Sequence, residues 1–197
     1  MTDVAIVDSG GANLASLQFA LERLGATSIV SNDPEQIRTA ARVLLPGVGA
    51  AGDAMRRLRE SGMDQLIPQL QVPLLGICLG MQLLYEHSDE GDTPCLGVFA
   101  GRIERLQPSA ERPVPHMGWN TLQSRRPDPL LAGIGAEDYV YFVHSFVAPL
   151  TADTAAASNY GESFTAVVTR ANFRGVQFHP ERSARVGARL LKNFLTL

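Results

Sequence analysis

Cys78 is the residue of this sequence that is best placed to act as a nucleophile. Gly76 and Gly80 lie two positions to either side of it, at the end of an apolar run that a helical segment follows. A sharp strand-to-helix turn lifts its central side chain out of a sheet, and small flanking residues make room for that turn. The start of a helix also favours the thiolate and leaves the backbone N–H of Leu79 free to stabilise an oxyanion. Most lone cysteines are small buried hydrophobes, but this pattern favours covalent catalysis.

A histidine and a glutamate near the C-terminus could complete a triad with Cys78. His179 follows the strand-like segment 174–178, and Pro180 separates it from Glu181. A thiol nucleophile needs an imidazole within hydrogen-bond reach, and the imidazole needs an acceptor that fixes its tautomer. A His-Pro-Glu sequence taken alone could equally be a surface turn. If Cys78 and His179 follow strands of one sheet, both lie at its carboxyl edge, where open α/β folds bind ligands.

The elements that must position these residues alternate in the first half of the chain. Strand-like runs are expected at 4–7, 28–30, 42–45 and 73–77. Helical patterns follow them at 14–24, from Pro34, at 54–59 and at 79–85. Asn13 can cap the first helix, and Gly25 can end it. Strands joined by helices of about ten residues indicate βαβ units and a parallel sheet.

The second half of the chain is expected to add strands without helices between them. These strands are predicted at 96–106, 139–147, 155–158, 164–169 and 174–178, and a last helix at 183–195. The expected fold class is therefore α/β, a three-layer sandwich whose central sheet is mixed, mostly parallel and extended by antiparallel strands. No linker or repeat interrupts the chain, so residues 1–197 are expected to form a single domain.

Composition limits the partners and the compartment. With 45% hydrophobic residues, 19% charged residues and a net charge of −3, the chain resembles an ordinary soluble protein without a nucleic-acid footprint. Neither a signal peptide nor a bilayer-spanning segment is recognisable. Cys78 and Cys95 lack the spacing of a disulfide framework or zinc site, which favours the cytoplasm, and Cys95 is expected to be a packing residue. His87, His116 and His144 also lack ligand spacing, so no metal is expected.

Three motifs in this order resemble the class I, or triad, glutamine amidotransferases. They are Pro46-Gly47-Val48-Gly49, Gly76-Ile77-Cys78-Leu79-Gly80-Met81-Gln82 and His179-Pro180-Glu181. The resemblance covers nearly the whole chain. It implies a flavodoxin-like sheet and the hydrolysis of glutamine to glutamate and ammonia without a cofactor. It also implies that Cys78 is the nucleophile, that His179 is the general base and acid, and that Glu181 orients His179.

The same resemblance implies roles for residues around the triad. The backbone N–H groups of Val48 and Leu79 would form the oxyanion hole. The residues implied to hold glutamine are Gly49, Gln82 and, through main-chain groups, Ser145 and Phe146.

Within the class, segments 115–120 and 141–146 are similar to the glutaminase subunits of imidazole glycerol phosphate synthases, which serve histidine biosynthesis. This similarity implies a heterodimer with a (β/α)₈ cyclase subunit that takes up the ammonia. The residues implied to face that partner are Asn13, Trp119, Asn120 and Arg182. Arg182 stands where a lysine is common, so a salt bridge to the partner would have a different geometry. Outside this context, a lone tryptophan such as Trp119 would be assigned to the core.

Three other functions stay open at the level of sequence. A cysteine peptidase or related thiol hydrolase on a similar sheet would need an extended peptide groove. A catalytically silent regulatory subunit would have no need of Cys78, His179 and Glu181 together. The same glutaminase chemistry could also supply a different synthase, and only the identity of the partner would distinguish that case.

Overall fold

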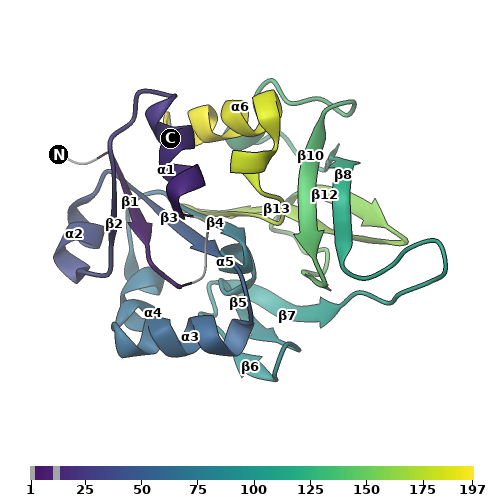
Figure 1. The fold of residues 1–197 in the computed structure, drawn as a ribbon, viewed down its shortest axis with the longest axis horizontal. Helices are drawn as coiled ribbons and strands as arrows, with labels where there is room; N and C mark the ends of the chain where they lie inside the picture. Colours follow the sequence, from purple (N-terminus) through teal and green to yellow (C-terminus); the bar gives the residue numbers. More distant parts are fainter. Residues whose placement is uncertain (1–2, 11–13) are drawn as a thin grey trace.

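A mixed β-sheet forms the centre of the computed structural model, which describes residues 3–10 and 14–197 (Figure 1). Within these residues the sheet has eight strands in the order β2-β1-β3-β4-β14-β13-β12-β9. The parallel part comprises β2 (Ser28–Ser31), β1 (Val4–Val7), β3 (Arg42–Gly47), β4 (Leu74–Cys78) and β14 (Phe173–Val176). The antiparallel extension comprises β13 (Glu162–Arg170), β12 (Thr154–Tyr160) and β9 (Gln123–Ser124). The predicted mostly parallel sheet with an antiparallel extension is confirmed.

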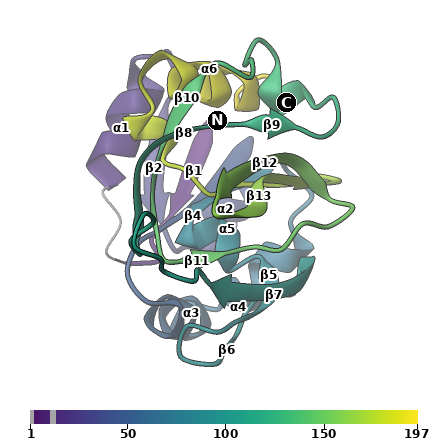
Figure 2. The same ribbon diagram turned by 90° about the vertical axis from the view of Figure 1, so that its right-hand side faces the viewer.

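Helices cover both faces of this sheet and complete three layers (Figures 1 and 2). One face carries α1 (Leu14–Glu22) and α6 (Ala184–Phe194), and the other carries α2 (Pro34–Thr39), α3 (Ala51–Glu60) and α4 (Met63–Leu66). Side chains of a strand alternate between faces, so Val4 and Ile6 join the first core while Ala5 and Val7 join the second. This double coverage explains why β1 is an unbroken apolar run. None of the helices in the described part of the chain has the length and apolarity needed to cross a bilayer.

Two smaller sheets lie beside the central one. A four-stranded sheet has the order β11-β7-β5-β6, and β8 pairs with β10 in an antiparallel ribbon. Their bounds are β5 (Tyr85–Ser88), β6 (Thr93–Pro94), β7 (Phe99–Arg105), β8 (His116–Thr121), β10 (Tyr139–His144) and β11 (Phe146–Val147). Short helices complete the fold at α5 (Leu79–Gln82), η1 (Ile67–Gln69), η2 (Pro129–Leu131) and η3 (Pro180–Arg182).

Some element boundaries differ from those expected. The helix predicted at 79–85 ends at Gln82, because Tyr85 begins β5 and pairs with β7. The strand predicted at 139–147 is divided at Ser145 into β10 and β11, which belong to different sheets. This division places Ser145 and Phe146 beside the end of the central sheet, where they line the pocket described next.

Candidate active site

Cys78 occupies a strained turn between β4 and α5. Its φ of 54° and ψ of −114° lie outside the regions that side-chain-bearing residues prefer. The turn is tight against its surroundings: a Cβ on Gly76 would lie 2.7 Å from the carbonyl oxygen of Gly80, and a Cβ on Gly80 would collide with the carbonyl of Leu45. Glycine is therefore required at both positions, and the turn presents the sulfur at the carboxyl end of the strand.

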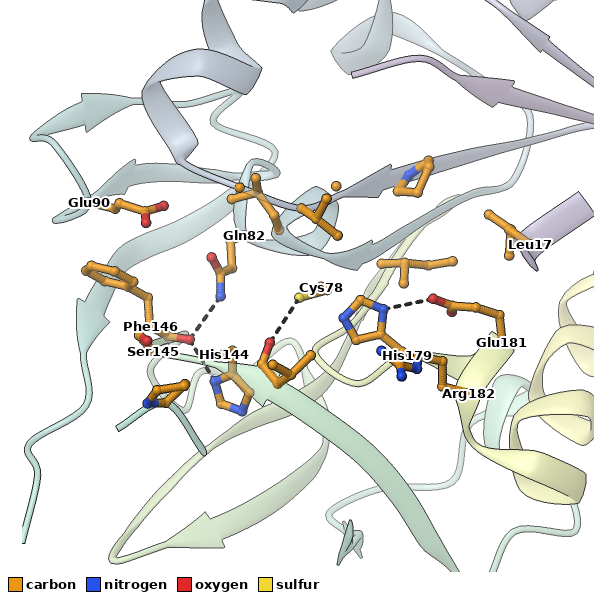
Figure 3. A pocket seen from close by; sticks show the side chains of 18 residues that line it. Leu17, Cys78, Gln82, Glu90, His144, Ser145, Phe146, His179, Glu181 and Arg182 are labelled. Carbon is orange, nitrogen blue, oxygen red and sulfur yellow. Dashed lines mark hydrogen bonds and ion pairs between the residues drawn. The ribbon is translucent and has the colours of Figure 1, made fainter. Parts of the chain in front are cut away.

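His179 and Glu181 reach this point from the neighbouring strand. β14 pairs in parallel with β4, and the chain continues beyond Val176 to His179. The backbone N–H of His179 donates to the carbonyl of Tyr141 at 3.0 Å, and the hydroxyl of Ser183 donates to the carbonyl of His179 at 2.7 Å. With Pro180 beginning η3, the Glu181 carboxylate folds back onto the ring, with Oε1 2.8 Å from Nδ1. Figure 3 shows the imidazole between Cys78 and Glu181.

The charges around His179 favour its protonated form. Burial alone would lower its pKa, but hydrogen bonds and charge attraction from Cys78 and Glu181 outweigh burial and raise the pKa to about 10. Because Nδ1 is hydrogen-bonded to Glu181, Nε2 is the ring nitrogen that is free to exchange a proton with the sulfur of Cys78. The arrangement places an imidazolium between the sulfur of Cys78 and the carboxyl group of Glu181, which suits a cysteine nucleophile with its acid and base.

A pocket of about 390 Å³ opens onto the sulfur. This volume is typical of a small-molecule site. The sequence-predicted residues that line it are Val48, Gly49, Cys78, Leu79, Gln82, Ser145, Phe146, His179, Glu181 and Arg182. These residues come from segments far apart in the sequence, so the fold brings the predicted triad and its predicted surroundings to one place (Figure 3).

The two segments expected to supply the oxyanion hole flank Cys78. Leu79 is the first residue of α5, where backbone N–H groups have no partner within the helix. Gly47, the last residue of β3, pairs in register with Cys78, so Val48 follows directly beside the nucleophile. Gly49 has a φ of 93°, which only glycine adopts at little cost.

Among the described residues predicted to face a partner, Arg182 lines the pocket, whereas Trp119 and Asn120 do not. Trp119 is 52% exposed on β8, so it is not a core residue. It contacts the Tyr141 ring edge-on, and the Arg182 guanidinium lies 5.0 Å from the centroid of the same ring. The amide of Asn120 donates to the carbonyl of Asn159 at 2.9 Å. Asn13 lies outside the described residues.

Glu90 and Gln177 were missed by the sequence interpretation. Glu90 lines the pocket, and one of its carboxylate oxygens accepts the backbone N–H of Ala51 at 2.8 Å. It lies in an acidic turn after β5 that has the composition of a solvated loop. Gln177 is fully buried beside Cys78. A glutamine at the end of a strand gives no signal of its own, although its position two residues before His179 could have directed attention to it.

Comparison with known proteins identifies relatives along the whole length of the chain. The class-I glutamine amidotransferase family matches residues 5–197. "Imidazole glycerol phosphate synthase subunit HisH" of Xanthomonas campestris pv. campestris is 55% identical over 197 residues, which cover 100% of this chain and 98% of the relative. The protein of the same name from Xylella fastidiosa is 53% identical with the same coverage.

Solved structures share the fold at lower identity. A crystal structure described as glutamine amidotransferase has a TM-score of 0.75 at 21% identity, with 98% of this chain and 97% of that chain covered. PurLQS from Thermotoga maritima has a TM-score of 0.72 at 18% identity, with 100% and 99% covered. The family match over residues 5–197 and the 55% identity to the HisH relative show that the chain belongs to the class I glutamine amidotransferases.

Proposed function

We propose that this chain is the glutaminase subunit of an imidazole glycerol phosphate synthase, and that it hydrolyses L-glutamine to L-glutamate and ammonia for histidine biosynthesis. The full-length similarity to the HisH subunits supports this assignment. The observation that carries the chemistry is the His179 imidazole, which hydrogen-bonds to Glu181 through Nδ1 and lies between Glu181 and Cys78 at the pocket (Figure 3). We also propose that residues 1–197 form a single domain.

The first chemical step in this proposal is attack of the Cys78 sulfur on the side-chain amide carbon of glutamine. Electrons of the amide carbonyl move to its oxygen, and the backbone N–H groups of Val48 and Leu79 stabilise that oxyanion. One such donor typically contributes about 3 kcal/mol to lowering the barrier. His179 then gives its proton to the amide nitrogen, ammonia leaves, and a γ-glutamyl thioester remains on Cys78.

The second step is hydrolysis of the thioester. His179, now neutral, takes a proton from water as that water attacks the thioester carbonyl, and the same oxyanion hole acts again. Collapse of the intermediate releases glutamate and restores the thiolate–imidazolium pair. Glu181 keeps the Nδ1 hydrogen in place throughout, so that Nε2 alone exchanges protons.

The pocket offers polar groups for the amino-acid end of glutamine. The carboxylate of Glu90 carries negative charge at the pocket wall, which suits the α-ammonium group. Gln82, Gly49 and the main chain at Ser145 and Phe146 complete the proposed binding surface. The side-chain carboxylate of the product glutamate is negatively charged and a poor electrophile, so the thiolate does not attack it and the product leaves the site unreacted.

The ammonia acceptor in this proposal is a (β/α)₈ cyclase subunit that forms a heterodimer over the rim of the pocket. Met117, Trp119 and Tyr139 are all exposed on the β8–β10 ribbon. With Tyr141, which pairs with Trp119, they give this ribbon an apolar face beside Arg182. An exposed apolar group of this kind marks a protein-binding surface. Asn13 and Asn120 are proposed to lie at the same interface, and the complex is proposed to be cytoplasmic, without nucleic acid or membrane as partners.

Ammonia release from glutamine, measured in the presence of the cyclase subunit, tests the proposed function. Cys78→Ala is expected to abolish release, while Cys95→Ala serves as a matched control that removes the other thiol. Casein and a peptide amide, offered to the same preparation, test the peptidase alternative. Release that survives Cys78→Ala, or faster cleavage of the peptide substrates than of glutamine, would contradict the proposal. Affinity capture with this chain as bait identifies the synthase that it serves.

A further inference from the structure

Two buried glutamine side chains lie behind the nucleophile. Gln177 is fully buried and directly follows β14, and Gln82 is 4% exposed and belongs to α5. Their amides hydrogen-bond to each other, with Gln82 Nε2 2.9 Å from Gln177 Oε1. Buried amides that pair in this way have fixed orientations, because every donor must face an acceptor.

A main-chain carbonyl sets the direction of this pair. Gln82 Nε2 lies 2.9 Å from the carbonyl oxygen of Phe146. A carbonyl can only accept, so the nitrogen of Gln82 must face it, and the second hydrogen of that nitrogen is directed to Gln177 Oε1. The remaining end of the Gln177 amide, its NH₂ group, lies 3.8 Å from the sulfur of Cys78.

His144 also contacts the Phe146 carbonyl, and His116 contacts His144. His144 Nδ1 lies 3.0 Å from this oxygen (Figure 3). His144 Nε2 lies 3.1 Å from Nδ1 of His116. Burial lowers the pKa of His116 to about 4, and burial together with the neighbouring His116 lowers that of His144 to about 3. Both rings are therefore neutral near pH 7, each with one hydrogen, and the network keeps a single arrangement of donors from His116 to the sulfur.

The sulfur of Cys78 otherwise faces groups of opposite effect. The positive charge of the His179 imidazolium attracts negative charge on the sulfur, whereas the carbonyl oxygen of Val143, 3.8 Å from the sulfur, repels it. An N–H donor from Gln177 would stabilise negative charge on the sulfur, as the imidazolium does, and would offset the repulsion from the Val143 carbonyl. We propose that Gln177 is a hydrogen-bond donor to the Cys78 thiolate, and that Gln82, His144 and His116 are positioning residues that direct its amide toward the sulfur. This inference rests on the proposed function, since it assigns a donor to the same nucleophile.

Two substitutions at Gln177 test the inference. Gln177→Met keeps the length of the side chain and removes the donor, and Gln177→Glu puts an acceptor against the sulfur. The rate of carbamidomethylation of the Cys78 peptide is measured against pH, together with kcat and KM for glutamine in the complex with the cyclase. Gln177→Met is expected to move the alkylation profile up by about one pH unit. It is also expected to lower kcat about tenfold with KM nearly unchanged. Gln177→Glu is expected to shift the profile further and to lower kcat more.

Thr165→Val is the matched control for the loss of a buried polar group. Thr165 is fully buried and its hydroxyl bonds to the carbonyl of Pro149 and to Thr154, away from the pocket. This variant is expected to unfold at a lower temperature with an unchanged alkylation profile and kcat. A folded Gln177→Met protein with the wild-type pH profile and kcat would overturn the inference while the proposed function stands.

A measurement on the unmodified chain covers the case in which the Gln177 variants do not fold. Nitrogen-15 NMR of the glutamine side chains is expected to show one buried NH₂ group that shifts with pH in step with alkylation of Cys78. That response is expected to vanish in Cys78→Ala. If no glutamine side chain follows the thiol, the inference is wrong; if instead Cys78→Ala still releases ammonia, the proposed function itself fails.

Discussion

Burial raises the pKa of the Cys95 thiol to about 11, whereas the sulfur of Cys78 faces the His179 imidazole at the wall of an open pocket. Cys95 therefore stays protonated near neutral pH, and a protonated thiol is a poor nucleophile. We expect iodoacetamide at about pH 7.5 to label Cys78 much faster than Cys95, measured by mass spectrometry of the two peptides. In urea both thiols are expected to react at similar rates. Equal labelling of the two in the folded protein would contradict this assignment.

The second prediction for a single residue concerns Glu181 and its effect on kcat. Its carboxylate fixes the Nδ1 hydrogen of His179 and stabilises the imidazolium. Glu181→Gln is expected to lower kcat for glutamine by about 10²-fold or more with a small change in KM, because the charge acts on the proton-transfer steps. Glu60→Gln, which removes a carboxylate from an exposed ion pair with Arg56, is the control and is expected to leave kcat unchanged. A Glu181→Gln enzyme with wild-type kcat would remove Glu181 from the triad.

Sequence reasoning could find Cys78, His179 and Glu181 because their chemistry depends on residue type and short-range spacing. Val48 and Leu79 followed from the same motifs. Glu90 and Gln177 could not be found in this way. Glu90 reaches the pocket through the return of the chain after β5, and the role of Gln177 depends on a carbonyl that is more than thirty residues away in the chain.

The turn between β4 and α5 depends on how closely β3 approaches it. A Cβ on Gly80 would collide with the carbonyl of Leu45 on β3, and that backbone cannot move without distorting the sheet. Gly80→Ala is expected to lower the free energy of unfolding by about 3 kcal/mol or more, measured by urea denaturation.

Gly52→Ala is the matched control for that substitution. Gly52 lies in α3, and its Cβ would meet its nearest neighbour, the hydroxyl of Thr93, at 3.5 Å, which is an ordinary contact. Alanine in a helix is expected to stabilise the protein by up to about 1 kcal/mol. A Gly80→Ala protein as stable as the wild type would contradict the close contact between β3 and the turn at Gly80.

The parallel strands were predictable because both of their faces are buried. β1, β3 and β4 are apolar along nearly their whole length, and glycine or proline marks their ends. β8 and β5 carry polar residues and alternate irregularly between buried and exposed positions. They form strands because β8 pairs with β10 and β5 pairs with β7. These pairings cannot be predicted from the local sequence pattern.

Across the whole molecule, His116 and His144 link stability to pH. The pKa of each is lowered from 6.5, to about 4 and about 3, and in the unfolded chain both take up protons below about pH 6.5. Their contribution to stability is present above 6.5 and is lost as the pH falls toward 4 and 3. We expect the free energy of unfolding to fall by about 2 kcal/mol per histidine from pH 7 to pH 5, and His116→Gln to reduce this slope. Stability that is flat over this range, or an unchanged slope in the variant, would contradict the burial of neutral rings.

The β8–β10 ribbon is the surface proposed to bind the cyclase subunit. Trp119 is exposed on the ribbon, and its removal is expected to weaken binding of the cyclase by about tenfold or more, measured by calorimetry. Alkylation of Cys78 is expected to be unchanged in Trp119→Ala, because Trp119 does not line the pocket. Val30→Ala, on the outermost strand β2, removes an exposed apolar side chain elsewhere and is expected to keep full affinity. Equal affinities of the two variants would place the interface on another surface.

The most direct test of the account is to trap the covalent intermediate that the geometry of Cys78 and His179 implies. The complex with the cyclase is mixed with labelled glutamine and quenched in acid within one turnover, and its peptides are analysed by mass spectrometry. A γ-glutamyl thioester on the peptide that contains Cys78, absent from Cys78→Ala, is the result that we predict. An active complex that releases ammonia while no glutamyl group is ever found on Cys78 would contradict it.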